Sequence, residues 1–194
     1  LIDKARELGL SGVMITDHEC LSAHMEVNQY AKKLREIDPD FTVALGNEIY
    51  LTNDRSRGQK YFHFILGAKD ALGHRALREM SSIAWYNSYE DRRMERVPLL
   101  KEEMREVMSR YKGHVIATTA CMGGELSTYA LTMSVAEDKQ EQNIVQECYN
   151  HIVEFMTDCL DIFGDDFYIE CAPSTTVDQM ITNRKLYNAF KCYC

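Results

Sequence analysis

The sequence predicts an α/β domain built on a mainly parallel sheet. Short apolar runs alternate along the chain with amphipathic segments of helical period, which is the order typical of βαβ units. The 194 residues contain no solenoid-type repeat and no long linker, and this length suits one domain with a substantial core. Apolar residues make up 45% and charged residues 27%, which excludes a disordered or fibrous protein. We therefore expect a single domain over residues 1–194.

The first half of the chain predicts three strands and three helices. Ile2, Ala5 and Leu8 recur on one helical face, and Gly9 ends that segment. A continuous apolar run then predicts a buried strand at 12–16, and helical spacing over 21–37 ends at Asp38-Pro39. The β-rich runs at 41–51 and 61–68 flank a polar turn and suggest a hairpin. A helix is expected at 71–86.

The second half predicts two more strands among helices. Pro98 should lie near the first turn of a helix at 99–111, a position that proline favours. Strands are expected at 115–118 and 167–170 because both runs are short and apolar. Gly123-Gly124 leads into a helix, a long acidic helix covers 135–163, and a closing helix covers 180–193. The chain starts within a helical pattern and ends without a stop signal, so we expect a piece of a longer protein.

Charge and cysteine content narrow the class of protein. The chain has 22 basic and 30 acidic residues and a net charge of −8, which argues against a freestanding nucleic-acid-binding protein but not against a domain beside one. The seven cysteines are odd in number and include no Cys-x-x-Cys pair, so they predict reduced thiols in a cytoplasmic protein. The longest nearly uncharged stretch, 114–136, contains Glu125 and several hydroxyl groups and is too polar to span a membrane.

Four consecutive strands each deliver a side chain that can bind a metal. Asp17-His18 follows the first strand, Glu48 lies in the second, His63 lies in the third and Cys121 follows the fourth. Ligands bind at the carboxyl ends of strands in parallel α/β folds, so these groups are expected to meet. Histidine, carboxylate and thiolate groups bind zinc, and histidine with carboxylate also suits manganese or iron. A carboxylate such as Glu48 can bridge two metals that activate water and a phosphoryl group.

Each of these residues also has a simpler explanation when taken alone. His18 suits a turn histidine, and Glu48 suits a carboxylate paired with a lysine or arginine. His63, between two phenylalanines, suits a core histidine, and Cys121 suits a small buried apolar residue. The pattern of all four favours a metal site. For Arg92, Arg93 and Arg96 a solvated helix end is favoured over contact with DNA or a neighbouring domain, and the remaining histidines are not assigned as ligands.

The ordered set of motifs resembles the PHP (polymerase and histidinol phosphatase) domain of the α subunit of bacterial DNA polymerase III. The matching stretches are Ile15-Thr-Asp-His18, Leu45-Gly-Asn-Glu-Ile-Tyr-Leu51, Tyr61-Phe-His-Phe-Ile-Leu-Gly-Ala-Lys69, Val115-Ile-Ala-Thr-Thr-Ala-Cys-Met-Gly-Gly-Glu125 and Phe163-Gly-Asp-Asp-Phe-Tyr-Ile-Glu170. They cover nearly the whole chain in the family's order. Cys121 stands where phosphatase members usually carry histidine, which favours the polymerase branch over the alternative of a stand-alone phosphatase of the histidinol-phosphatase type.

The resemblance implies a distorted (β/α)7 barrel with a multi-metal site. By position, His18, Glu48, His63 and Cys121 match metal ligands, with Glu48 in the bridging place. Asp17 matches a family aspartate that acts in catalysis or orients His18. The family also has a His-x-His strand upstream and an Asp-x-His strand downstream, so the first and last strands are expected to be missing here. The implied cofactor is Zn or Mn, with Mg as a further option, at an incomplete site.

The resemblance also implies a function. The complete protein would be a DNA-directed DNA polymerase, a nucleotidyltransferase, and this domain a metal-dependent phosphoesterase of the 3′-5′ exonuclease type or its structural remnant. The fragment alone is expected to be inactive. The implied partners are the rest of the polymerase chain, DNA through that chain and a proofreading subunit, with no membrane.

Overall fold

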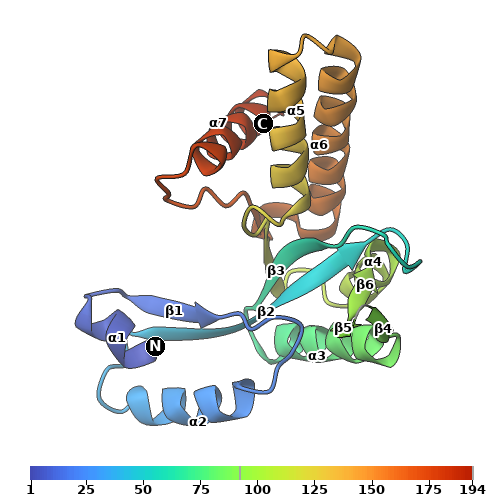
Figure 1. The fold of residues 1–194 in the computed structure, drawn as a ribbon. Helices are drawn as coiled ribbons and strands as arrows, with labels where there is room; N and C mark the ends of the chain where they lie inside the picture. The colour runs from blue at the N-terminus through green and yellow to red at the C-terminus, as the bar shows by residue number, and fades with distance from the viewer. Residues whose placement is uncertain (92, 194) are drawn as a thin grey trace.

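The computed structural model describes residues 1–91 and 93–193, and it shows a six-stranded mixed sheet with helices on both sides (Figure 1). The strands of this sheet are β1 (Gly12–Ile15), β2 (Thr42–Thr52), β3 (Phe62–Ala68), β6 (Pro98–Leu100), β7 (Val115–Thr118) and β8 (Phe167–Tyr168). The helices are α1 (Ile2–Glu7), α2 (His24–Leu34), α3 (Ala71–Tyr86), α4 (Lys101–Arg110), α5 (Glu125–Asp138), α6 (Gln142–Phe163) and α7 (Val177–Tyr193), with a 3-10 turn η1 (Gly164–Asp166) before β8.

The sheet has the order β1-β2-β3-β7-β8, and β6 pairs with β2. The β1–β2, β2–β6 and β7–β8 pairings are parallel, while β3 runs antiparallel to both β2 and β7. The predicted α/β class and the β2–β3 hairpin are therefore confirmed, and the sheet is rich in parallel pairs. Within the described residues no pairing joins β1 to β8, so a closed (β/α)7 barrel is not confirmed.

The main core lies between the sheet and helices α3, α4, α5 and α6. Phe64 on β3 is 1% exposed, and its ring centroid lies 6.0 Å from those of Phe155 and Phe163 on α6. In the same core, α3 approaches the turn before β7 so closely that a Cβ on Gly73 would lie 2.0 Å from the carbonyl oxygen of His114. A glycine is therefore needed where α3 meets this turn. A smaller cluster of Ile2, Ala5, Ile15, Leu34 and Phe41 holds α1 and α2 against β1.

Two helix predictions in the second half are wrong at their boundaries. Pro98–Leu100 forms β6 instead of starting a helix, because the free edge of β2 pairs with it, and α4 begins at Lys101. The expected helix at 135–163 is two helices: α5 ends at Asp138, Gln140 takes a φ of 61°, and α6 begins at Gln142. The reversal lets α5 and α6 pack side by side, with α7 across them (Figure 1).

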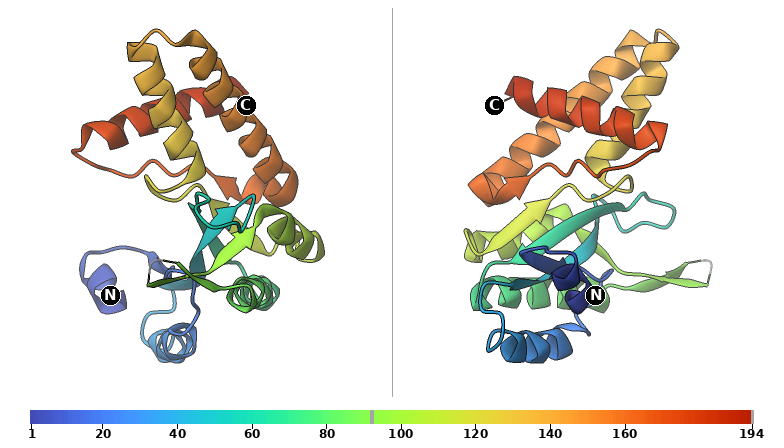
Figure 2. Two further views of the ribbon diagram at one scale, coloured as in Figure 1. Left: turned by 45° about the vertical axis from the view of Figure 1, so that its right-hand side comes forward. Right: turned by 90° about the vertical axis from the view of Figure 1, so that its left-hand side faces the viewer.

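A small hairpin also replaces the solvated helix end expected around residues 92–96. Its strands are β4 (Tyr89–Asp91) and β5 (Met94–Arg96), and it projects from the body of the domain beyond α3 (Figure 2). Arg93 adopts a φ of 66° at its tip, and Arg92 lies outside the described residues. Among residues 1–91 and 93–193, no helix combines the length and apolar character needed to cross a bilayer.

Candidate metal centre

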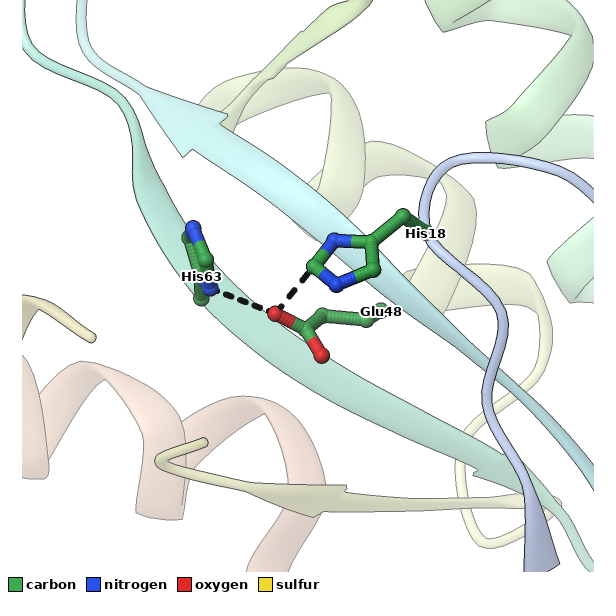
Figure 3. A group of neighbouring side chains, drawn as sticks. All are labelled: His18, Glu48 and His63. Atoms are coloured by element: carbon green, nitrogen blue, oxygen red, sulfur yellow. Dashed lines mark ion pairs between the residues drawn. The ribbon is translucent and has the colours of Figure 1, made fainter. Parts of the chain in front are cut away.

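Three predicted ligands meet on one face of the sheet. His18 from the loop after β1, Glu48 from β2 and His63 from β3 point toward one another, and their ligand atoms all lie within 4.8 Å of each other (Figure 3). Oε1 of Glu48 lies 2.5 Å from Nδ1 of His63 and 3.6 Å from Nδ1 of His18. Within residues 1–91 and 93–193, the alternative of a lysine or arginine partner for Glu48 is not observed, because its ion-pair partners are these two histidines.

The backbone of β2 explains how the three residues meet. The β1 segment continues alongside β2 as far as an isolated bridge between His18 and Glu48, and the amide of Glu48 donates to the carbonyl of Asp17. On the other edge, His63 pairs with Tyr50, which lies two residues from Glu48 and therefore on the same face. Because β3 is antiparallel to β2, His63 reaches the site from the start of its strand. The expectation that carboxyl ends of parallel strands alone build the site is thus wrong for His63.

Cys121 lies beside the cluster. Its Sγ is 3.4 Å from Nδ1 of His63 and accepts a hydrogen bond from the amide of Gly123 at 3.3 Å. A Cβ on Gly123 would come within 3.0 Å of the His63 ring, so glycine allows this loop to pack against the imidazole. The thiol is exposed and stands next to the three-residue group without being part of it. It is placed so that it could complete the donor set.

Asp17 contributes its main chain to the site. Its carbonyl accepts hydrogen bonds from the Glu48 amide at 3.1 Å and from Nδ2 of Asn47 at 2.8 Å. Its side chain is exposed and is not part of the group formed by His18, Glu48 and His63. The catalytic role of the Asp17 carboxylate stays a prediction, whereas its peptide positions the Glu48 strand.

The Glu48 carboxylate provides a test of whether the site suits a cation. Its side chain is 13% exposed, and Oε1 is shielded from solvent without a well-directed hydrogen bond from any described residue, although two imidazole nitrogens approach it. A buried carboxylate oxygen that lacks hydrogen-bond donors is costly unless a positive charge lies beside it. Imidazole nitrogen, carboxylate oxygen and a nearby thiol are also the donors that Zn²⁺ prefers, and the first two suit Mn²⁺. The residues present therefore fit a divalent metal.

Sequence reasoning missed Tyr50. Its hydroxyl lies 3.0 Å from Nδ1 of His18 in a hydrogen bond, and its ring stacks on His63 with centroids 4.9 Å apart. Burial, followed by the charges of Glu19 and Glu48, raises the pKa of the Tyr50 phenol, so the hydroxyl keeps its proton at neutral pH. Tyr50 thus contacts both histidines. Its position two residues after Glu48 on a strand was the signal that could have identified it.

Two residues with positive φ flank the ligands. Glu19, directly after His18, has a φ of 56°, and Ala120, directly before Cys121, has a φ of 57°. Such conformations cost about 1 kcal/mol or more for residues other than glycine, and they cluster at functional sites. Here each lets the chain turn sharply beside a ligand.

Glu19 is a second residue that the sequence did not reveal. Burial raises its carboxyl pKa from 4.5 to about 8, against the lowering effect of Arg96 and with a smaller contribution from Glu95. Its Oε1 is shielded from solvent and has no hydrogen-bond partner among the residues that the structure describes. Its main chain is well held, because its amide donates to the Glu48 carbonyl at 2.8 Å and its carbonyl accepts from the Trp85 indole at 2.8 Å.

The raised pKa of Glu19 predicts a pH-dependent stability in the metal-free chain. The folded state holds this proton more tightly than the unfolded chain does, so the stabilisation is complete below about pH 4.5 and is lost as the pH rises toward about 8. Glutamine at this position does not titrate, so Glu19→Gln should lack this pH-dependent loss of stability. In EDTA the variant should therefore melt above the wild type at about pH 8, with a gap that shrinks toward about pH 4.5. Thermal unfolding followed by circular dichroism measures this; the exposed control Glu36→Gln should show no such trend, and a pH-independent gap for Glu19→Gln would contradict the prediction.

The other histidines have partners away from this cluster. His114 bonds to Asp70, and His151 bonds to the buried Glu125, which also binds Lys101. His24 is buried, with Nε2 2.9 Å from the Gly46 carbonyl and Nδ1 3.0 Å from Nε2 of His74. His24 and His74 line a cavity of about 400 Å³ between α2, α3 and the sheet. That cavity shares no lining residue with the metal centre.

Comparison with known proteins agrees with the resemblance seen in the sequence. The family model described as PHP domain matches residues 1–174. The probable DNA polymerase YorL of Bacillus subtilis (strain 168) is 36% identical over 205 residues, covering 100% of this chain and 16% of that protein, and the DNA-directed DNA polymerase of Bacillus phage SPbeta gives the same values. The DNA polymerase III subunit alpha of Aquifex aeolicus is 28% identical, with 100% of this chain and 15% of that protein covered. The chain thus spans about a sixth of the length of the curated relatives it matches. It belongs to the PHP domain family.

Proposed function

We propose that this chain is the PHP domain of a DNA polymerase of the polymerase III α class, and that its metal centre hydrolyses phosphoesters in the manner of a 3′-5′ exonuclease. The buried Glu48 carboxylate between His18 and His63 carries the proposal, because this donor set suits a cation and has no other evident role. The polymerase relatives, which match along the whole chain, support the parent class. They do not favour the alternative of a stand-alone enzyme of the histidinol-phosphatase type.

The chain's own residues divide the work at this site. His18, Glu48 and His63 would hold the metal, with Cys121 as a further donor. When bound, Zn²⁺, Mn²⁺ or Mg²⁺ supplies Lewis-acid activation of a phosphoryl group and of the attacking water. Tyr50 fixes His18 through its hydroxyl and His63 through its ring. The protonated phenol is also a hydrogen-bond donor at the site.

The test uses the full-length protein that contains this chain. A single-stranded oligonucleotide labelled at its 5′ end should lose nucleotides from its 3′ end in the presence of Mn²⁺ or Zn²⁺. EDTA and Glu48→Gln should each abolish the shortening, whereas the exposed control Glu36→Gln should not. A full-length protein that binds metal stoichiometrically but leaves the oligonucleotide intact would overturn the hydrolytic function.

A second candidate is a structural domain that supports the polymerase and a proofreading partner. Its specific support is the small donor set, since the described residues bring together only His18, Glu48 and His63, with Cys121 beside them. In addition, Glu170 is followed by Cys-Ala-Pro-Ser, where polymerase members often carry a glutamine and histidine stretch. Elemental analysis of the full-length protein separates the two, because near-stoichiometric metal favours the active site and its absence favours the structural role.

The partners follow from the parent class. We propose that the domain contacts the rest of the polymerase chain, reaches DNA through it and acts in the cytoplasm. The closed seven-stranded barrel also belongs to this proposal, since it would require strands beyond the sheet described above.

A further inference from the structure

One edge of β2 is shared by two strands, and the gap between them opens beside the metal centre. The β1 segment runs along this edge until His18 pairs with Glu48, and Glu19 then turns away. β6 takes over the same edge when Pro98 pairs with Tyr50. Arg96 is two residues before Pro98. It therefore lies near the point where the chain turns away from β2 at Glu19.

The surroundings of Arg96 place its guanidinium next to the centre. Its Cζ lies 5.9 Å from the centroid of the Tyr61 ring, and Tyr61 precedes His63 by two residues, which puts both on the same face of an extended chain. Arg96 also precedes the residue pair Pro98–Tyr50 by two positions, and the Tyr50 hydroxyl is the group that bonds to His18. Arg96 therefore lies beside residues that neighbour the metal ligands.

The Arg96 guanidinium has an N–H donor without an acceptor among the described residues. Within the described part of the chain Arg96 makes no ion pair within 4 Å, and its Nε is shielded from solvent without an acceptor. Among the same residues, Glu19 likewise leaves Oε1 without a hydrogen-bond partner. A guanidinium carries five N–H donors in a planar fork that matches phosphate oxygens. A buried donor without an acceptor is costly, and a phosphate would satisfy it.

We infer that Arg96 binds the phosphate group of the substrate at this centre. The inference deepens the proposed function and rests on it for the identity of the substrate as a nucleotide phosphoester. A chain with a net charge of −8 needs a local cation to receive an anion, and the ligand cluster itself contributes a carboxylate. The contact of Arg96 with Tyr61 holds the guanidinium in place.

The test measures binding, not turnover. The chain in Mn²⁺ is titrated calorimetrically with thymidine 5′-monophosphate, and in parallel with thymidine, which lacks the phosphate. Arg96→Gln should weaken binding of the nucleotide about tenfold or more, as expected for loss of a charged hydrogen bond. Binding of thymidine should not change. Arg93→Gln, with the same charge change at the exposed tip of the hairpin, should alter nucleotide affinity by no more than about twofold.

Arg96→Lys controls for a folding defect, because lysine keeps the positive charge but lacks the planar set of N–H donors. It should show an intermediate affinity with manganese content equal to that of the wild type. Equal nucleotide affinity in the wild type and Arg96→Gln would overturn the inference, as would a wild type that binds the nucleotide no better than thymidine. If the full-length protein fails to shorten DNA while nucleotide binding still depends on Arg96, the hydrolytic function falls and the phosphate site stands.

Discussion

Glu48→Gln is expected to weaken Mn²⁺ or Zn²⁺ binding by at least about 100-fold while the fold is retained, since even partners that only orient a ligand are worth about 10–100-fold. Glutamine has the shape of glutamate but lacks the charge that would hold a cation beside His18 and His63. It also removes a buried carboxylate oxygen that has no directed hydrogen bond, so the metal-free variant should be at least as stable as the wild type.

Calorimetric metal titration and thermal unfolding in EDTA check the two halves of this expectation. The exposed control Glu36→Gln should bind metal like the wild type. Loss of metal together with a large loss of stability would show that the substitution disrupts the sheet, and unchanged metal affinity would remove Glu48 from the centre.

The second large effect is expected from Phe64→Ala, which should destabilise the domain by about 3–5 kcal/mol. Phe64 is 1% exposed and joins β3 to α6 through Phe155 and Phe163, so its removal leaves a cavity between the sheet and the longest helix. Since whole domains are stable by only about 5–15 kcal/mol, the variant should be close to unfolding.

Urea unfolding followed by circular dichroism measures this loss. Tyr86→Ala, which removes an aromatic ring that is 91% exposed, is the matched control and should change stability by about 0.5 kcal/mol or less. A loss of similar size in both variants would mean that the core is not centred on Phe64.

The sequence predicted those parts of the fold whose signals are local. The α3 and β7 boundaries agree with the expected residues, since the Asp70 side chain caps α3 and an uninterrupted apolar run forms β7. The α5–α6 reversal was missed because neither glycine nor proline marks it, and Gln140 makes the turn. β6 was missed because its cause is the open edge of β2, a partner distant in sequence.

At the site, too, the residues with a local sequence signal were predicted, and those placed by pairing between distant segments were not. Glu48 and His63 stand out in the sequence because a charged or titratable group inside an apolar strand needs a partner. Tyr50 stands out less, since tyrosine is common in strands, although its spacing from Glu48 was informative. Glu19 and Arg96 carried no local signal, because their proximity depends on two strands sharing one edge of β2.

The length of β2 has a consequence for how this centre responds to motion. One strand pairs with β1, β3 and β6, and it carries Glu48 and Tyr50 on a single face. Sliding it by one residue would send the carboxylate to the opposite side and break its pairing with all three neighbours. The position of the Glu48 carboxylate in the centre therefore depends on the pairing of the whole sheet, so loss of that pairing would displace this ligand.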